Sequence, residues 1–151
     1  MKYIAYGSNM SEEQMAFRCP HAKLIGTGYL PNYQLEFYLH ATVEKCRVIG
    51  PGVPVAVWEI DAEDEKYLDR YEGYPTYYGK RMATVNMADG SKIKGMLYIM
   101  NYIRTEMPTE HYYHGIVQAY NRLGIGSEIE PVLEAALRRS IVRSQYLHLH
   151  W

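Results

Sequence analysis

The chain has 151 residues and almost balanced charges, 16 lysines and arginines against 17 aspartates and glutamates. This balance, without a basic run, argues against nucleic acid or an anionic membrane as the main partner. No stretch approaches the roughly 20 apolar residues of a membrane span. Cys19 and Cys46 are too few for a disulfide framework, so we expect two free thiols in a cytoplasmic, single-domain protein.

The chain opens with a strand that runs into a turn and a helix start. Residues 1–6 are rich in β-forming types, and Gly7-Ser8-Asn9 are types that make turns. Ser11 can cap the helix that follows, Gln14 can complete a capping box, and Pro20 should end it. This succession gathers backbone N–H groups around one small volume, which favours an anion such as phosphate or carboxylate. A plain connection is the alternative.

Strands dominate the middle of the chain. Gly26 and Gly28 indicate a bent or bulged strand, and Pro54 must lie at an edge or near a strand start. Asp89-Gly90 is a hairpin turn. Residues 33–40 alternate between apolar and polar types, as in a strand with one buried face. The predicted strands are 22–30, 33–40, 42–49 (or an irregular lid), 53–60, 77–87 and 92–100.

Three further helices follow from capping and stop residues. Asp61 caps a helix over 62–71 that Gly73 ends. Pro108-Thr109 opens a helix to about residue 123, and Ser127 to Glu130 reads as a capping box for a final helix. The tail 147–151 alternates and could add a short strand. Together these elements predict an α+β fold with a mostly antiparallel, barrel-like sheet and flanking helices.

Two features indicate where chemistry resides. The chain has 16 tyrosines and only 2 phenylalanines, and buried phenols need hydrogen-bond partners, which favours a polar, semi-enclosed cavity. Glu72 follows a helix C-terminus, set among aromatic residues and away from cations. Such a carboxylate should have a raised pKa, as a general base near neutral pH requires. An exposed glutamate at a helix end is the alternative.

Other catalytic classes find little support. The six histidines are scattered, and His148 and His150 without a third ligand make a poor zinc site, so we expect no metal. Ser8 lacks the setting of an activated nucleophile. Cys19 has only Arg18 beside it as an electropositive neighbour.

Several stretches, in order, resemble the gamma-glutamylcyclotransferases (AIG2-like). They are Tyr3 to Met10, Arg18-Cys19-Pro20, Ala41-Thr42-Val43, Gly52 to Ile60, Leu68 to Pro75 with Tyr77-Tyr78, Met100-Asn101-Tyr102, and Pro108 to Tyr112. The chain departs from the family pattern at residues 43–46, where the family more often has proline. That departure leaves the leaving-group preference open.

The resemblance implies one gamma-glutamylcyclotransferase-like domain over residues 1–151, with a barrel-like α+β fold and no metal or organic cofactor. It implies Glu72 as the base, and a substrate site formed by Tyr3, Ile4, Ala5, Tyr6, Gly7, Ser8, Asn9 and Tyr112. The implied reaction cleaves a small-molecule γ-glutamyl amide, as in glutathione metabolism, to 5-oxoproline and an amine or amino acid.

Two alternatives stay open. One is a cyclotransferase for a γ-glutamylamine or a γ-glutamyl-protected biosynthetic intermediate. Asn9 and the two C-terminal helices resemble the amino-acid branch more than the γ-glutamylamine branch. The other is a non-catalytic binding module on the same fold, against which the presence of Glu72 argues. Monomer and homodimer are both compatible with the sequence.

Overall fold

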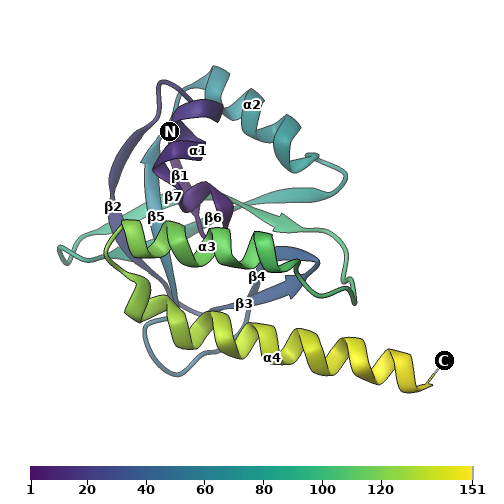
Figure 1. The fold of residues 1–151 in the computed structure, drawn as a ribbon. Coiled ribbons are helices and arrows are strands. Elements are labelled where there is room, and N and C mark those ends of the chain that lie inside the picture. The colour runs from purple at the N-terminus through teal and green to yellow at the C-terminus, as the bar shows by residue number, and fades with distance from the viewer. Residues whose placement is uncertain (151) are drawn as a thin grey trace.

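The protein is built on a closed five-stranded barrel (Figure 1). A computed structural model describes the backbone of residues 1–150 and the side chains of residues 1–146. Around the barrel the strand order is β1-β5-β2-β6-β7. All pairs are antiparallel except the closing contact between β1 and β7, which confirms the predicted α+β barrel. The bounds are Lys2–Ala5 (β1), Lys23–Leu30 (β2), Val53–Glu59 (β5), Tyr78–Met87 (β6) and Lys92–Met100 (β7).

Glycine and proline have the positions in the barrel that their backbone properties require. The register between β2 and β5 shifts between Leu24 and Gly26, which confirms the predicted bulge. A Cβ on Gly28 would lie 2.5 Å from the Asn86 carbonyl oxygen, so only glycine allows β6 this close. Pro54 is the second residue of β5, near the strand start as expected.

The strands β3 (Tyr33–Tyr38) and β4 (His40–Lys45) form a separate hairpin. The prediction of one buried face for 33–40 was wrong, because Glu36 and Tyr38 are buried as well. Helix α4 (Gly126–His150) packs along β3 and covers the second face. Glu36 is accommodated there by ion pairs with arginines of α4. Of residues 42–49, only those up to Lys45 form a strand.

The remaining helices are η1 (Ser8–Met10), α1 (Glu12–Arg18), α2 (Ala62–Glu72) and α3 (Glu110–Arg122). Ser11 caps α1 by accepting from the Gln14 N–H at 3.3 Å. Asp61 caps α2 through a complete capping box, and Gly73 ends α2 at φ 64°. In Figure 1, α3 crosses the middle of the molecule between α2 and α4.

Two predictions about the last helix were wrong. Helix α4 begins at Gly126, so Ser127 lies inside it and bonds the Glu128 side chain at 3.0 Å instead of capping. The predicted strand at 147–151 is helix up to His150, because extending an existing helix avoids the cost of nucleation. Trp151 lies outside the described residues.

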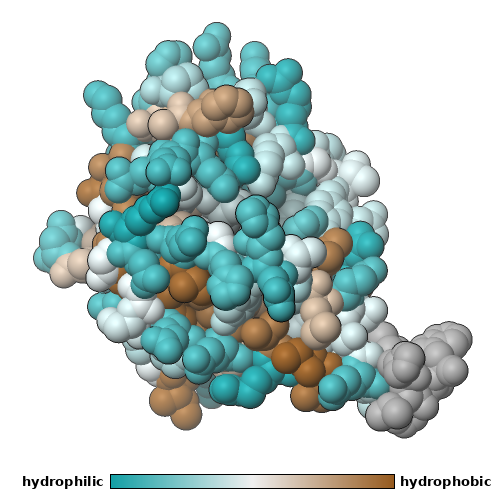
Figure 2. Space-filling model, viewed as in Figure 1, coloured by the Kyte–Doolittle hydropathy of each residue, from teal (hydrophilic) through white to brown (hydrophobic). Residues whose placement is uncertain are grey.

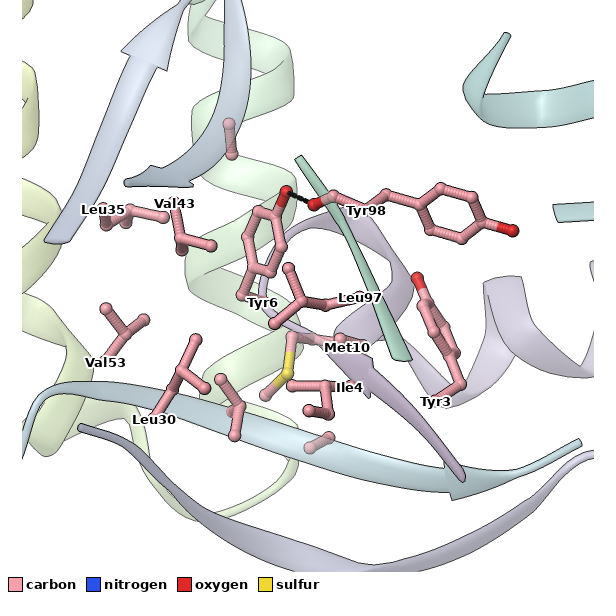
Figure 3. Close-up of a cluster of buried hydrophobic side chains, with 14 of the residues drawn as sticks. Tyr3, Ile4, Tyr6, Met10, Leu30, Leu35, Val43, Val53, Leu97 and Tyr98 are labelled. Carbon is pink, nitrogen blue, oxygen red and sulfur yellow. Dashed lines mark hydrogen bonds between the residues drawn. The ribbon is translucent and has the colours of Figure 1, made fainter. Parts of the chain in front are cut away.

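The core fills the barrel and continues under the β3–β4 hairpin. Figure 3 shows side chains from both regions in contact, among them Ile4, Leu30, Leu35, Val43 and Leu97. The hydroxyl of Tyr6 reaches through this core and donates to the Tyr98 carbonyl. The face seen in Figure 2 is mostly hydrophilic, with small apolar groups, one of them over α4. No helix of the described residues has both the length and the apolar character to cross a membrane.

Candidate active site

A cavity of about 280 Å³ opens at one end of the barrel, where β1, η1, the end of α2, β4 and α3 meet. Its lining comes from segments that are far apart in the sequence, and seven tyrosines contribute to it, which confirms the expected phenol-rich cavity. The lining residues are Tyr3, Tyr6, Gly7, Ser8, Asn9, His40, Ala41, Tyr71, Glu72, Tyr77, Tyr78, Tyr98 and Tyr112.

The structure brings most of the predicted site residues into this cavity. Tyr3, Tyr6 and the Gly7-Ser8-Asn9 turn face the same space as Glu72 and Tyr112. Ile4 and Ala5 are different, because they are fully buried and do not line it. Ile4 packs inside the barrel, within 3.1 Å of where a Cβ on Gly95 would lie.

The residues of the opening turn line the cavity and include the start of η1. Met10 N–H donates to the Gly7 carbonyl at 3.0 Å, which closes η1. The first N–H groups of a helix have no partner within it, so those of Ser8 and Asn9 are not used by η1. Gly7 has φ −125°, and an added Cβ would lie 3.7 Å from both Ala41 Cβ and the Tyr112 hydroxyl. A methyl at Gly7 therefore has room, but only in space that belongs to the cavity.

Glu72 is the last residue of α2 and is partly buried. Burial raises the pKa of its carboxyl to about 7, against a smaller lowering effect of Arg18. The raised pKa agrees with the sequence-based expectation. The expectation of no nearby cation was wrong, because α1 folds against α2 and brings Arg18 close to the site.

A hydrogen-bonded chain connects Glu72 to the opening turn. Asn9 Nδ2 donates to the Tyr3 hydroxyl at 2.8 Å and to Glu72 Oε1 at 3.5 Å. The Asn9 carbonyl oxygen accepts from the Arg18 guanidinium. That guanidinium lies 3.6 Å from the centre of the Tyr71 ring. Asn9 is thus held on both sides and presents a donor to the carboxylate.

The opposite wall is built around Ala41 of β4. Its N–H donates to the Tyr112 hydroxyl at 2.9 Å, and its carbonyl accepts from the Tyr78 hydroxyl at 2.8 Å. His40 Nδ1 lies 3.1 Å from the Tyr77 hydroxyl. Burial, with a smaller contribution of Arg104, lowers the pKa of His40, so the imidazole is neutral near pH 7.

The cavity phenols are neutral polar groups. Burial raises the pKa values of the tyrosine hydroxyls at Tyr3, Tyr6, Tyr78, Tyr98 and Tyr112. Sequence reasoning had not assigned to the site His40, Ala41, Tyr71, Tyr77, Tyr78 or Tyr98. The tyrosine excess was the signal that pointed to such a lining, but it could not select these residues.

One group of potential metal ligands lies elsewhere. His21, Asp61 and Asp64 place one ligand atom each within 4.8 Å of one another. Asp61 and Asp64 form the capping box of α2, which accounts for their position. None of the three lines the cavity.

Comparisons with known proteins agree with this fold. A family model described as "Gamma-glutamyl cyclotransferase, AIG2-like" matches residues 3–116. No curated protein matches the chain. A structure named gamma-glutamyl cyclotransferase is similar with a TM-score of 0.79 at 24% identity, over 89% of this chain and 86% of that one. The structure of an uncharacterized Homo sapiens protein is similar with a TM-score of 0.78 at 25% identity, with the same coverage of both chains. YkqA from Bacillus subtilis is similar with a TM-score of 0.68 at 18% identity, over 89% of this chain and 54% of the YkqA chain.

Proposed function

Since the chain belongs to the AIG2-like gamma-glutamyl cyclotransferase family, we propose that it cleaves a γ-glutamyl amide to 5-oxoproline and an amine or amino acid. Family membership supports a cyclotransferase activity in general. The specific reaction, and Glu72 as its base, are our proposal.

One observation carries this proposal. A carboxylate with a pKa of about 7 lies in the same cavity as the Gly7-Ser8-Asn9 turn, although the two are far apart in the sequence. A base whose pKa is near the working pH is both available and strong enough to accept a proton. Backbone N–H groups bind a carboxylate or a developing oxyanion. A γ-glutamyl compound carries an α-ammonium that can give its proton to the base. It also carries an α-carboxylate and a γ-carbonyl that the N–H groups can bind.

The reaction balances with Glu72 as the sole proton carrier. Glu72 accepts a proton from the substrate's α-ammonium, and the freed amine attacks the γ-carbonyl carbon. A C–N bond forms, closing a five-membered ring, and the carbonyl oxygen becomes an oxyanion that the N–H groups of the Gly7-Ser8-Asn9 turn stabilise. Glu72 returns this proton to the leaving nitrogen, the original amide C–N bond breaks, and the carbonyl re-forms. The ring nitrogen, which still carries two protons, passes one of them to Glu72, which then releases it to the departing amine or to water.

This mechanism explains why the cavity needs no activated serine or cysteine. The nucleophile belongs to the substrate, so the protein has to fold the substrate until amine and carbonyl meet. Well-oriented intramolecular reactions gain on the order of 7–11 kcal/mol from such positioning. Seven tyrosines form the walls that would hold the substrate in this conformation. The hydroxyls of Tyr78 and Tyr112 are themselves fixed by hydrogen bonds to the backbone of Ala41.

The size of the cavity favours a small substrate. Its volume of about 280 Å³ is just below the roughly 300–1,000 Å³ typical of small-molecule sites. An amino-acid-sized γ-glutamyl group fits such a space, with the leaving group toward the opening. We expect no nucleic acid or membrane partner in the reaction.

A product assay tests the proposal. Purified protein is incubated with a panel of γ-glutamyl dipeptides and γ-glutamylamines, and 5-oxoproline is quantified by mass spectrometry. We expect release from at least one compound by the wild type and a strongly reduced rate in Glu72→Gln. Binding of these compounds without any 5-oxoproline would identify a binding module instead of an enzyme. A preference for amines over dipeptides would favour the γ-glutamylamine alternative.

A further inference from the structure

Arg18 contacts the candidate site from behind without lining the cavity. It is the last residue of α1, and its guanidinium donates to the carbonyl oxygen of the Asn9 side chain. The same guanidinium stacks on Tyr71, 3.6 Å from the ring centre. Tyr71 in turn lies with its hydroxyl 3.4 Å from Ser8 Oγ. Arg18 therefore bridges the two segments, η1 and the end of α2, that form the Glu72 side of the cavity.

The contact with Arg18 decides which end of the Asn9 amide faces Glu72. A side-chain amide has a carbonyl oxygen that only accepts and an NH₂ that only donates. Arg18 can only donate, so it takes the oxygen and leaves the NH₂ for Tyr3 and Glu72. In a flipped amide, the NH₂ would face the guanidinium, where two donors meet. The oxygen would face the Glu72 carboxylate, where two acceptors repel each other.

We propose that Arg18 is a positioning residue for Glu72, which fixes the Asn9 amide as a donor to the carboxylate and supplies the positive charge that balances it. The proposal rests on the proposed function, since it concerns the residue assigned as the base.

The other groups around Glu72 do not offer a compensating charge. Phenols face it from β1, β6, β7 and α3, and all of them are protonated near neutral pH. His40 on β4 is neutral at that pH. Among the described residues, Arg18 is the charged side chain that acts on the Glu72 carboxyl, and it lowers a pKa that burial raises. Without Arg18, the pKa of Glu72 should rise further, leaving less of the base ionised at neutral pH.

Titration of Glu72 in the ligand-free protein tests this directly. The carboxyl carbon is followed by NMR in protein labelled at glutamate, and Glu72→Gln identifies its resonance. We expect Arg18→Gln to move the midpoint upward by about one pH unit or more, as loss of a nearby opposite charge does. Arg18→Lys keeps the charge without the planar fork that holds Asn9, so its shift should be smaller.

Arg122 offers a matched control. It is the last residue of α3, as Arg18 is of α1, and it pairs with Glu13 at 3.1 Å, outside the cavity. Arg122→Gln should leave the Glu72 midpoint unchanged. An unshifted midpoint in folded Arg18→Gln, or an equal shift in Arg122→Gln, would overturn the proposal. Backbone amide spectra establish that each variant is folded.

The activity profile provides a second readout. In Arg18→Gln, the acidic limb of kcat/KM should move to higher pH by the same amount as the NMR midpoint, and activity should recover toward the wild-type value at alkaline pH. A merely structural loss would lower activity equally at every pH, which would contradict the proposal. If wild-type protein turned over no γ-glutamyl compound, the proposed reaction would fail, while the NMR titration would still decide the role of Arg18.

Discussion

Two glutamates of this protein, one buried and one partly buried, have opposite surroundings. Glu36 on β3 is only 3% exposed, and both of its carboxylate oxygens are paired, with Arg139 at 2.7 Å and Arg143 at 3.1 Å. Glu72 receives one amide hydrogen bond at 3.5 Å. In the described part of the chain, no lysine or arginine nitrogen lies within 4 Å of its carboxylate.

This difference separates a structural carboxylate from a chemically available one. The arginines on α4 also donate to the carbonyls of Leu35 and Phe37, so the Glu36 cluster attaches the last helix to the β3–β4 hairpin. Both oxygens of the Glu36 carboxylate are therefore occupied by contacts that hold the fold together. Glu72 has been desolvated without a direct ion pair, which destabilises the charged form and leaves the carboxyl able to exchange a proton.

The largest expected effect is the loss of the base. Glu72→Gln keeps the shape of the side chain but cannot accept a proton, so kcat should fall by roughly 10²- to 10⁴-fold. The midpoint of urea unfolding should not decrease. Steady-state 5-oxoproline production measures kcat. Near wild-type turnover in this variant would refute the assignment of Glu72 as the base.

Glu36→Gln should produce the opposite pattern. It leaves Arg139 and Arg143 facing a neutral amide, and breaking a buried ion pair in this way costs about 3 kcal/mol. Urea unfolding at an unchanged m-value measures that loss, while kcat of the folded fraction should stay near wild type. Glu134→Gln, an exposed change on the same helix α4, serves as the control and should be within about 0.5 kcal/mol of wild type. Equal stability of the two variants would contradict the role given to Glu36.

The raised pKa of Glu72 also predicts how stability depends on pH. Burial raises the folded-state pKa to about 7, above the roughly 4.3 of an unfolded glutamate. Between these values the unfolded chain releases its proton first, so it binds fewer protons and stability falls as pH rises. Relative to Glu72→Gln, the wild type should lose about 3 kcal/mol between pH 4 and pH 8. Parallel stability curves for the two proteins would show that the carboxyl titrates normally.

A smaller effect is expected at the opening turn. The methyl of Gly7→Ala would occupy cavity space between Ala41 and Tyr112, and misplacing the substrate should lower kcat/KM roughly tenfold. Stability should change by less than about 1 kcal/mol, because the added methyl has no contact closer than 3.7 Å. Gly115→Ala, in an open position of α3, is the control and should leave kcat/KM unchanged. A Gly7→Ala protein with full activity would place the substrate elsewhere.

The smallest expected effect is that of metal removal. The proposed nucleophile is the substrate's own amine and the base is Glu72, so no step calls for a metal ion. Dialysis against EDTA should leave the rate of 5-oxoproline release unchanged. Loss of activity that zinc then restores would assign a catalytic part to a ligand group such as His21, Asp61 and Asp64.

Local chemistry in the sequence was sufficient for most of the secondary structure. Capping by Ser11 and Asp61, the stop at Gly73 and the bulge near Gly26 depend on neighbouring residues only, and each was predicted correctly. The raised pKa of Glu72 was also predicted, but its main cause is burial in the folded chain and not the helix C-terminus that the sequence shows.

Only the tertiary structure decided which distant residues meet. Nothing near Glu36 in the sequence indicates that two arginines about a hundred positions later neutralise it. The sequence therefore predicted a strand with one exposed face. Nothing near Glu72 indicates that Arg18 approaches it, or that β4 contributes Ala41 and His40 to the opposite wall. These contacts follow from the closure of the barrel and the docking of helices on it. Burial and electrostatics depend on distance in space, whereas a sequence pattern reports only distance along the chain.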